Sequence, residues 1–357
     1  MDTFTVQVNT NHLTTYMAFP PPLPAKLLPP TDLVEEEPTP HYKPQHFYPI
    51  GWGTSSTVWL ARDLHQWRWR PPRYVAIKRR SVRITEHITK ANPQHLGNNF
   101  VTTWLDSFRV ASPGGPHICM VFDALCEPLW MLKHRFEGNT MPLDVMKPVS
   151  KLILIGLQYL HTEFHVIRTD LKPDNILLAL NDPSILDSVA QDEMNDPSPR
   201  KQPDSREIYL SRNYWGLSPD YLGDRYSVDI WNSGVMLCDL VYGHGPFDIP
   251  RDARGPGSAD EAHLGRIISL LGPPPSDLLD RGRETSRYYG AQGQFKFPEL
   301  IGKKDLLSMT KKIDDDDELR QFIDLISRML RWSPEDRATA QDLISHPWLS
   351  QIGPANR

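Results

Sequence analysis

Cysteine is scarce in this chain of 357 residues, which contains three. Cys119, Cys126 and Cys238 form no C-x-x-C pair and leave one thiol over, so we expect no disulfide framework and favour a reducing compartment, the cytoplasm or the nucleus. The first residues lack a basic stretch followed by an apolar core, which argues against a signal peptide. No apolar run is long enough to span a bilayer, so we predict no membrane partner.

An excess of positive charge is also absent. The net charge of −5 provides no basic surface for a nucleic acid, and we predict no direct nucleic-acid partner. The hydrophobic content of 39% and the charged content of 23% are typical of a globular chain with a buried core. The length allows two domains or one large two-lobed domain.

Proline, in contrast, is abundant, with 34 residues, and some of them form clusters near the N-terminus. Residues 19–24 and 28–30 are proline-rich runs of the polyproline type. We interpret residues 1–45 as a disordered proline-rich tail. The alternative is that this tail is a ligand for an aromatic groove of a partner protein.

From Gly51 onward, the pattern indicates ordered elements of two kinds. Short β-rich runs predict antiparallel strands at residues 58–61, 74–78, 100–105 and 117–122. Apolar residues at helical spacing predict helices within residues 152–160, 230–241 and 319–330. The sequence therefore predicts a small β-rich lobe, residues 46–125, followed by a larger and mainly helical lobe, residues 126–352.

The sequence around Asp170 carries the strongest chemical signal. Lys172 follows two residues later, Asn175 follows five residues later, and an apolar run at residues 176–178 predicts a short strand. Phosphoryl transfer needs a carboxylate that accepts a hydroxyl proton, a cation near the migrating phosphate and an amide oxygen for the metal. The spacing fits the kinase catalytic loop H-R-D-L-x-x-x-N, so we predict Asp170 and Lys172 as catalytic residues and Asn175 as a metal and ATP ligand.

Two further motifs, in the required order, predict a nucleotide site. Residues 51–58 follow G-x-G-x-x-G-x-V, with Ser56 in place of the third glycine. Small residues allow backbone N–H groups to approach phosphate oxygens, and Val58 would cover an adenine. Residues 75–78 match V-A-I-K, the strand whose lysine, here Lys78, pairs with the α- and β-phosphates.

With these motifs the chain resembles eukaryotic protein kinases, and more narrowly the serine/arginine-protein kinase family in its fungal form. The resemblance covers roughly residues 46–352 and also includes the T-D of residues 169–170 and the later segments 227–232 and 332–349. It implies an α+β, bilobed protein-kinase fold and a monomer that uses ATP and Mg²⁺. It further implies transfer of the γ-phosphate to Ser or Thr of Arg/Ser-rich protein substrates, in the regulation of RNA processing.

The resemblance also assigns individual residues. Phe122 would be the gatekeeper, and the backbone of Asp123 and Leu125 would hold adenine. The ATP-binding residues that we predict are Ile50, Gly51, Gly53, Ser56, Val58, Ala76, Lys78, Phe122, Asp123, Leu125 and Asn175.

Three structural residues follow from the same resemblance. Asp229 would anchor the catalytic loop from a buried helix. Arg337 would brace the triplet 218–220, whose Asp220 stands where such kinases carry the glutamate of A-P-E.

The chain departs from the family in its activation segment. No D-F-G occurs between Asn175 and Asp229, so the aspartate that binds the metal and most of the segment are missing. Asp220 could stand in for that aspartate, but its distance along the chain to Asp229 fits the A-P-E position better.

The smaller lobe departs from the family as well. The segment between Lys78 and Val101 is short for a full regulatory helix and leaves Glu86 as the acidic residue nearest to an ion-pairing position. Pro44 and Pro49 precede Gly51, and since proline lacks the N–H of a ladder strand, we predict a shortened or missing first strand. These gaps are flanked by well-matched sequence, which favours lost blocks over point substitution.

A fourth departure lies in the catalytic loop, where Arg168 replaces the family's histidine. That position is mainly structural, so we expect the replacement to be tolerated.

The departures leave three alternatives to an active kinase. The chain could be a pseudokinase scaffold that binds nucleotide without transferring phosphate. It could be an interaction protein that recruits a partner through its proline-rich tail. It could also fail to fold as one unit, because missing blocks leave unpaired strand edges.

Overall fold

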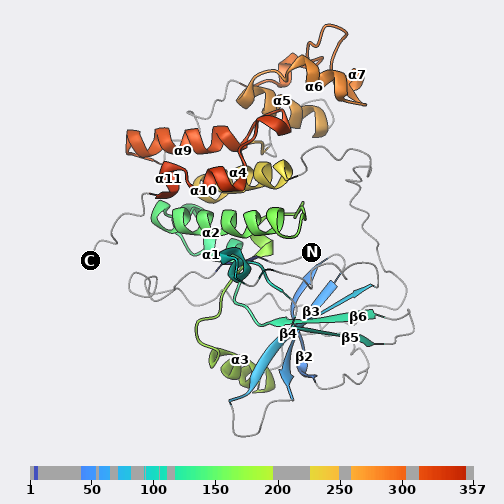
Figure 1. The fold of residues 1–357 in the computed structure, drawn as a ribbon, viewed down its shortest axis with the longest axis vertical. Coiled ribbons are helices and arrows are strands. Elements are labelled where there is room, and N and C mark those ends of the chain that lie inside the picture. The colour runs from blue at the N-terminus through green and yellow to red at the C-terminus, as the bar shows by residue number, and fades with distance from the viewer. Residues whose placement is uncertain are drawn as a thin grey trace.

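The computed structural model describes residues 4–6, 42–53, 56–64, 71–81, 92, 94–103, 105–110, 117–195, 226–248, 259–302 and 313–350. Within these ranges an antiparallel sheet lies beside a larger group of helices (Figure 1). This arrangement confirms the expected two-lobed α+β architecture. No helix in the described ranges is both long and apolar enough to cross a membrane.

The smaller lobe is a five-stranded antiparallel sheet with the strand order β2-β3-β4-β6-β5. Its strands are β2 (Tyr42–Gly53), β3 (Ser56–Asp63), β4 (Arg73–Ser81), β5 (Asp106–Val110) and β6 (His117–Asp123). The strands predicted at residues 58–61, 74–78 and 117–122 are therefore confirmed.

The strand predicted at residues 100–105 is wrong. Leu96–Phe100 form a 3₁₀ helix, η1, and the strand begins only at Asp106. The prediction relied on the apolar residues Phe100 and Val101, and both are buried. Val101 is buried in the core of the helical lobe rather than in a strand of the sheet. A short apolar run does not by itself distinguish a strand from a buried connection.

The prediction of a shortened or missing first strand is also wrong. β2 spans 12 residues despite Pro44 and Pro49. It is an edge strand that pairs with β3 alone, and its register shifts between Pro44 and Pro49 and between Pro49 and Gly51. Proline is tolerated at sheet edges and at bulges because no ladder N–H is needed there.

The larger lobe is mainly helical. Its α-helices are α1 (Leu129–Lys133), α2 (Leu143–Thr162), α3 (Ile185–Asn195), α4 (Ser227–Tyr242), α5 (Ala259–Leu271), α6 (Ser276–Arg281), α7 (Thr285–Tyr288), α9 (Asp316–Met329), α10 (Ala340–Ile344) and α11 (Pro347–Ser350). Short 3₁₀ turns are η2 (Glu137–Asn139), η3 (Pro173–Asn175), η5 (Pro298–Leu300) and η6 (Pro334–Asp336). The helices predicted within residues 152–160, 230–241 and 319–330 are confirmed as parts of α2, α4 and α9.

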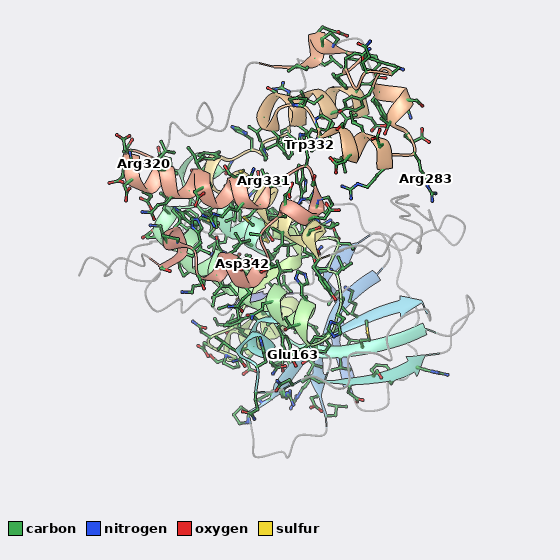
Figure 2. The ribbon with its side chains drawn as sticks, turned by 45° about the horizontal axis from the view of Figure 1, so that its top comes forward. Glu163, Arg283, Arg320, Arg331, Trp332 and Asp342 are labelled. Carbon is green, nitrogen blue, oxygen red and sulfur yellow. The ribbon has the colours of Figure 1, made fainter. Side chains whose placement is uncertain are left out.

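The core of this lobe lies between α2, α4 and α9, which Figure 1 shows stacked in layers. Leu157, Leu240 and Leu325 contribute fully buried side chains, one from each helix. Gly234 allows α4 to approach the end of α9 closely, because a Cβ atom there would lie 2.9 Å from Leu330 Cδ2. Trp332, labelled in Figure 2, donates its indole N–H to the carbonyl of Gly272 at 2.9 Å and so joins the ends of α9 and α5.

The 3₁₀ helix η1, which lies between β4 and β5, packs against α2 and joins the two lobes by contact. A Cβ atom on Gly97 of η1 would lie 2.7 Å from the carbonyl oxygen of Ile155, so only glycine allows this approach. The hydroxyl of the buried Tyr159 donates to the backbone oxygen of Asn92 at 3.2 Å and to Asn98 Oδ1 at 3.1 Å. The sheet is thereby attached to the helix that leads into the catalytic loop.

Two stretches of the expected tail are strands rather than disordered chain. Phe4–Val6 form β1, which pairs in parallel with β7 (Ile176–Leu178), the short strand predicted after the catalytic loop. The last part of the tail, from Tyr42, belongs to β2. The proline clusters at residues 19–24 and 28–30 lie outside the described residues.

Candidate active site

The structure brings the three predicted catalytic-loop residues together between α2 and β7. Asn175 Nδ2 donates to the backbone oxygen and to the Oδ2 atom of Asp170, both at 2.9 Å. Lys172 Nζ lies 3.4 Å from Asp170 Oδ1. The Asp170 side chain keeps 34% of its surface exposed, so the carboxylate is held in place while remaining accessible to a substrate.

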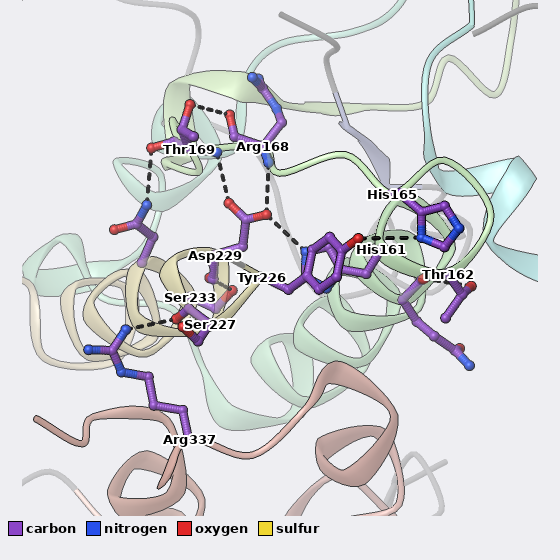
Figure 3. A network of polar contacts seen from close by, with 12 residues as sticks. His161, Thr162, His165, Arg168, Thr169, Tyr226, Ser227, Asp229, Ser233 and Arg337 are labelled. Carbon is purple, nitrogen blue, oxygen red and sulfur yellow. Dashed lines mark hydrogen bonds and ion pairs between the residues drawn. The ribbon is translucent and has the colours of Figure 1, made fainter. Parts of the chain in front are cut away.

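A buried carboxylate anchors this loop (Figure 3). Asp229 on α4 is fully buried; its Oδ1 accepts the N–H of Thr169 at 2.8 Å and its Oδ2 accepts the N–H of Arg168 at 2.8 Å. His161 Nε2, from the end of α2, lies 2.9 Å from the same Oδ2. These three contacts stabilise the buried Asp229 carboxylate, because a buried carboxylate without hydrogen-bond partners is strongly unfavourable.

The residue before Asp170 is held in a strained conformation. Thr169 has φ = +58°, and the left-handed region is a real outlier for a β-branched side chain, at a cost of about 1–3 kcal/mol. Its N–H is bound by Asp229, its carbonyl accepts from Asn232 Nδ2 at 3.1 Å, and its hydroxyl donates to the Arg168 carbonyl at 2.8 Å. Three local hydrogen bonds therefore offset the strain next to the candidate base.

The replacement of the loop histidine by Arg168 leaves the contact with Asp229 intact. The contact with Asp229 uses the backbone N–H of Arg168, which any residue except proline supplies. The side chain itself is buried.

Sequence reasoning missed three members of this network. His161 contacts Asp229, Asn232 binds the Thr169 carbonyl, and the Tyr226 ring packs against His161 with centroids 4.6 Å apart. The signal was present, because His161 stands in the segment 159–162 and Asn232 in the segment 227–232, and both segments resemble those of the family. Their function could not be read from spacing, since the groups that they contact are about 60 residues away along the chain.

The register of the sheet places four predicted ATP-binding side chains on one face. Lys78 lies directly opposite Val58, and Ala76 lies directly opposite Phe122. Opposite residues in a ladder share a face, and so do residues two apart in one strand. The opposite face forms the small lobe's own core from Ala61, Val75, Ile77, Cys119 and Val121.

The glycine-rich turn lies at the edge of this face. Gly51 pairs with Val58, and Gly53 pairs with Ser56, at the turn between β2 and β3. Ile50 precedes them in β2. The structure thus places both glycines at the end of β2, next to the start of β3, and their contact with phosphate stays a prediction.

The segment after β6 connects the sheet to the catalytic loop. Asp123 is mostly exposed and pairs with Arg73 at 3.2 Å, and Leu125 is half-buried. Immediately afterwards, Cys126 N–H donates to the carbonyl of Leu178 in β7 at 2.9 Å. The predicted adenine segment and the strand behind Asn175 are therefore bonded to each other.

Helix α3 contacts the same face of the sheet. Tyr74 lies two residues before Ala76, and its hydroxyl donates to Asp187 Oδ1 of α3 at 3.0 Å. Burial and, secondarily, this hydrogen bond raise the pKa of Tyr74. Helix α3 therefore lies at the Tyr74 end of the face that carries Ala76 and Lys78.

Arg337 braces the beginning of α4. Its guanidinium donates to the carbonyls of Ser227 at 3.0 Å and Trp332 at 3.2 Å and lies 4.8 Å from the centre of the Trp231 ring (Figure 3). The predicted contact with Asp220 and the shortened regulatory segment with Glu86 lie outside the described residues.

A solvent-open cavity of about 580 Å³ lies next to Arg337. Arg331 and Asp342, both labelled in Figure 2, line it together with Arg328. None of its lining residues belongs to the catalytic loop, so this cavity is separate from the candidate active site.

The part of the chain that the structure describes supplies little for a metal ion. No three His, Cys, Asp or Glu side chains gather there in a metal-binding arrangement. Asn175 gives its Nδ2 to Asp170, which leaves its Oδ1 as a free ligand atom. Mg²⁺ is usually bound by one or two carboxylates besides phosphate oxygens and water, so the residues described here do not form a complete magnesium site.

Comparison with known proteins identifies the family. The model of the protein kinase domain matches residues 46–349. The chain belongs to the protein kinase domain family.

Similar proteins indicate which group of protein kinases this chain resembles. The kinase is 29% identical to a serine/threonine protein kinase of Aspergillus fumigatus, over 88% of this chain and 91% of that protein. It is 28% identical to the serine/threonine-protein kinase SRPK of Physarum polycephalum, over 90% and 92% of the two chains. Protein kinase dsk1 of Schizosaccharomyces pombe is 36% identical over 144 residues, 37% of this chain and 26% of dsk1. These relatives confirm the resemblance to serine/arginine-protein kinases.

Proposed function

We propose that this protein is a serine/threonine protein kinase in which Asp170 is the general base. The supporting observation is the anchored loop: Asn175 and Lys172 hold the Asp170 carboxylate, and buried Asp229 holds the two residues before it. Asp170 would accept the proton of a Ser or Thr hydroxyl, and the Lys172 cation would lie beside the transferred group.

The residues on the sheet face fit ATP. Lys78 would contact the phosphates, Val58 and Ala76 would enclose the adenine, and Phe122 would close the back of the site. Bound ATP supplies the phosphoryl group. For Mg²⁺ the described residues offer the amide oxygen of Asn175 but no cluster of three His, Cys, Asp or Glu side chains.

We further propose Arg/Ser-rich proteins as substrates, in the cytoplasm or the nucleus, and a kinase that acts as a monomer. The names of the relatives support the substrate class. The domain boundaries proposed are a proline-rich tail at residues 1–45, whose two ends contribute β1 and the start of β2, a small lobe at 46–125 and a large lobe at 126–352.

The test is phosphate transfer. Purified protein with radiolabelled ATP and an Arg/Ser-rich peptide should incorporate label, and Asp170→Asn should abolish it. Loss of one transition-state contact costs about 10²–10³ in rate, and we expect at least that reduction from the missing D-F-G. Exposed Asp174, in the same loop, provides the matched control as Asp174→Asn. Folded wild-type protein that transfers no label would contradict the proposal.

A second candidate, a pseudokinase that binds nucleotide without turnover, is favoured by one specific observation. The sequence has no D-F-G between Asn175 and Asp229. The alignment with the A. fumigatus kinase spans 378 positions, more than the 357 residues of this chain, so that relative has residues where this chain has none. A nucleotide-dependent rise in melting temperature that Lys78→Met removes, combined with no label transfer, would support this candidate.

The proline-rich tail is a proposed ligand for an aromatic groove of a partner. Deleting residues 12–40 leaves β1 and β2 in the chain and should abolish capture of that partner. Unchanged capture would exclude this function for the tail.

A further inference from the structure

The cavity beside Arg337 lies where the end of α9, the turn η6 and helix α10 meet. Its volume of about 580 Å³ lies within the range of about 300–1,000 Å³ that is usual for ligand pockets. Ala338 donates its N–H to the carbonyl of Arg328 at 3.0 Å, and Arg337 Nε donates to the carbonyl of Arg331 at 2.9 Å. These backbone contacts hold the walls of the cavity together.

Charged side chains of both signs line this cavity, and positive ones predominate. They are three arginines and two aspartates: Arg328, Arg331, Arg337, Asp336 and Asp342. Arg328 donates from its Nε to Asp324 Oδ2 at 3.0 Å, and the same Oδ2 lies 2.9 Å from His346 Nε2. The guanidinium of Arg328 is thus positioned before any ligand binds.

Besides Arg328, two of these charges are used within the protein. Arg337 directs its guanidinium N–H groups to the carbonyls of three residues. Asp342 accepts the N–H and the hydroxyl of Thr339 at 3.0 and 2.6 Å, and the hydroxyl contact is the main reason that the pKa of Asp342 is lowered. Arg331 and Asp336 differ, because neither side chain has a hydrogen-bond or ion-pair partner among the residues that the structure describes. One cation and one carboxylate therefore remain for a ligand.

We propose that this cavity binds a phosphoserine next to an arginine, the repeating unit of a phosphorylated Arg/Ser-rich segment. Arg331 would bind the phosphate, because the planar guanidinium donates two parallel hydrogen bonds to phosphate oxygens. Asp336 would accept the guanidinium of the ligand's arginine. A ligand with only one sign of charge would leave either Arg331 or Asp336 without a partner.

The ligand class rests on the proposed function, since Arg/Ser-rich substrates contain such units after phosphoryl transfer. None of the residues that line the cavity belongs to the catalytic loop, so binding here is separate from the transfer step. The cavity would hold a phosphorylated product at a second place on the kinase.

Binding of a synthetic peptide to the full-length protein tests the proposal. The fluorescent peptide alternates arginine with phosphoserine, and its binding is followed by anisotropy without ATP. Because the peptide is phosphorylated beforehand, the measurement does not depend on phosphate transfer by this protein. Failure of the transfer assay would therefore leave this test intact, and failure of this test would leave the proposed kinase activity intact.

Arg331→Ala removes the guanidinium but keeps the carbonyl that Arg337 binds. We expect it to weaken peptide binding about tenfold, the effect of one hydrogen bond to a charged group. Arg320→Ala is the matched control, because Arg320 is also exposed but lies near the other end of α9 (Figure 2). It should change the affinity by less than about twofold, because exposed charges more than about 8 Å apart are largely screened at physiological ionic strength.

Asp336→Asn tests the contact with the ligand's arginine. It should weaken binding of the arginine–phosphoserine peptide about threefold, which is typical of an exposed ion pair. A second peptide, with alanine in place of arginine, should bind equally to wild type and to Asp336→Asn.

Any of three results would overturn the proposal. The first is that the phosphorylated peptide binds no more tightly than its unphosphorylated form. The second is that Arg331→Ala binds as tightly as wild type or loses no more affinity than Arg320→Ala, which would indicate attraction to general surface charge. The third is that inorganic phosphate competes at the peptide's own Kd, since the cavity would then bind a free anion. The first and third need no variant, so they decide the case even if a variant unfolds.

Discussion

Replacing Asp229 should destabilise this protein more than replacing any exposed carboxylate near the candidate site. Asp229 is fully buried and accepts two backbone N–H groups, those of Arg168 and Thr169, besides its contact with His161. Each buried N–H left without an acceptor costs about 1–3 kcal/mol. We therefore expect Asp229→Ala to lower the free energy of unfolding by about 2–6 kcal/mol, because both backbone N–H groups lose their acceptor.

Asp229→Asn separates the hydrogen bonds from the volume of the side chain. Asparagine has nearly the same shape but offers one oxygen and one NH₂ group. Whichever way the amide is turned, its NH₂ faces the N–H of either Arg168 or Thr169, so one backbone donor loses its acceptor. We expect a loss of about 1–3 kcal/mol, together with faster hydrogen exchange of the amide that has lost its partner.

The assay is urea unfolding followed by tryptophan fluorescence, which ten tryptophans make sensitive. Native domains are stable by about 5–15 kcal/mol, so either loss is measurable. Asp174→Asn, in the same loop but exposed, should change stability by less than about 0.5 kcal/mol. An Asp229→Asn variant as stable as Asp174→Asn would refute the reasoning that this carboxylate holds the loop.

Three further outcomes follow from the packing of the helical lobe. Gly234→Ala should cost about 1–3 kcal/mol by thermal unfolding, because the new Cβ would lie 2.9 Å from Leu330 Cδ2; an unchanged melting temperature would contradict this close packing. The hydrogen bond from His346 is the main reason that the pKa of Asp324 is lowered, so its contribution is present above about pH 4 and declines as the pH falls further. Urea midpoints of Asp324→Asn and wild type should therefore differ at pH 7 and converge toward pH 2, and a constant difference would disprove the linkage. Burial raises the pKa of the Cys238 thiol to about 12, so iodoacetamide at pH 8 should label it only in urea, as mass spectrometry can verify.

The sequence alone determined the local chemistry of this protein. Asp170, Lys172 and Asn175 stand within six residues, and V-A-I-K places Lys78 two residues from Ala76 on a strand. Such motifs are readable because their groups are close along the chain and because the period of a strand fixes which side chains share a face. The main helices were readable for the same reason, since their apolar residues recur at helical spacing.

Only the tertiary structure decided which distant groups meet. The contacts of Asp229 with His161 and the loop backbone join residues 60 or more positions apart, and no local pattern encodes such a contact. The first strand was predicted to be shortened or missing because of Pro44 and Pro49, but its place at the sheet edge makes the missing N–H groups harmless. The pairing of Phe4–Val6 with β7 joins segments about 170 residues apart, because a short apolar strand accepts whichever segment the folded chain brings to its open edge.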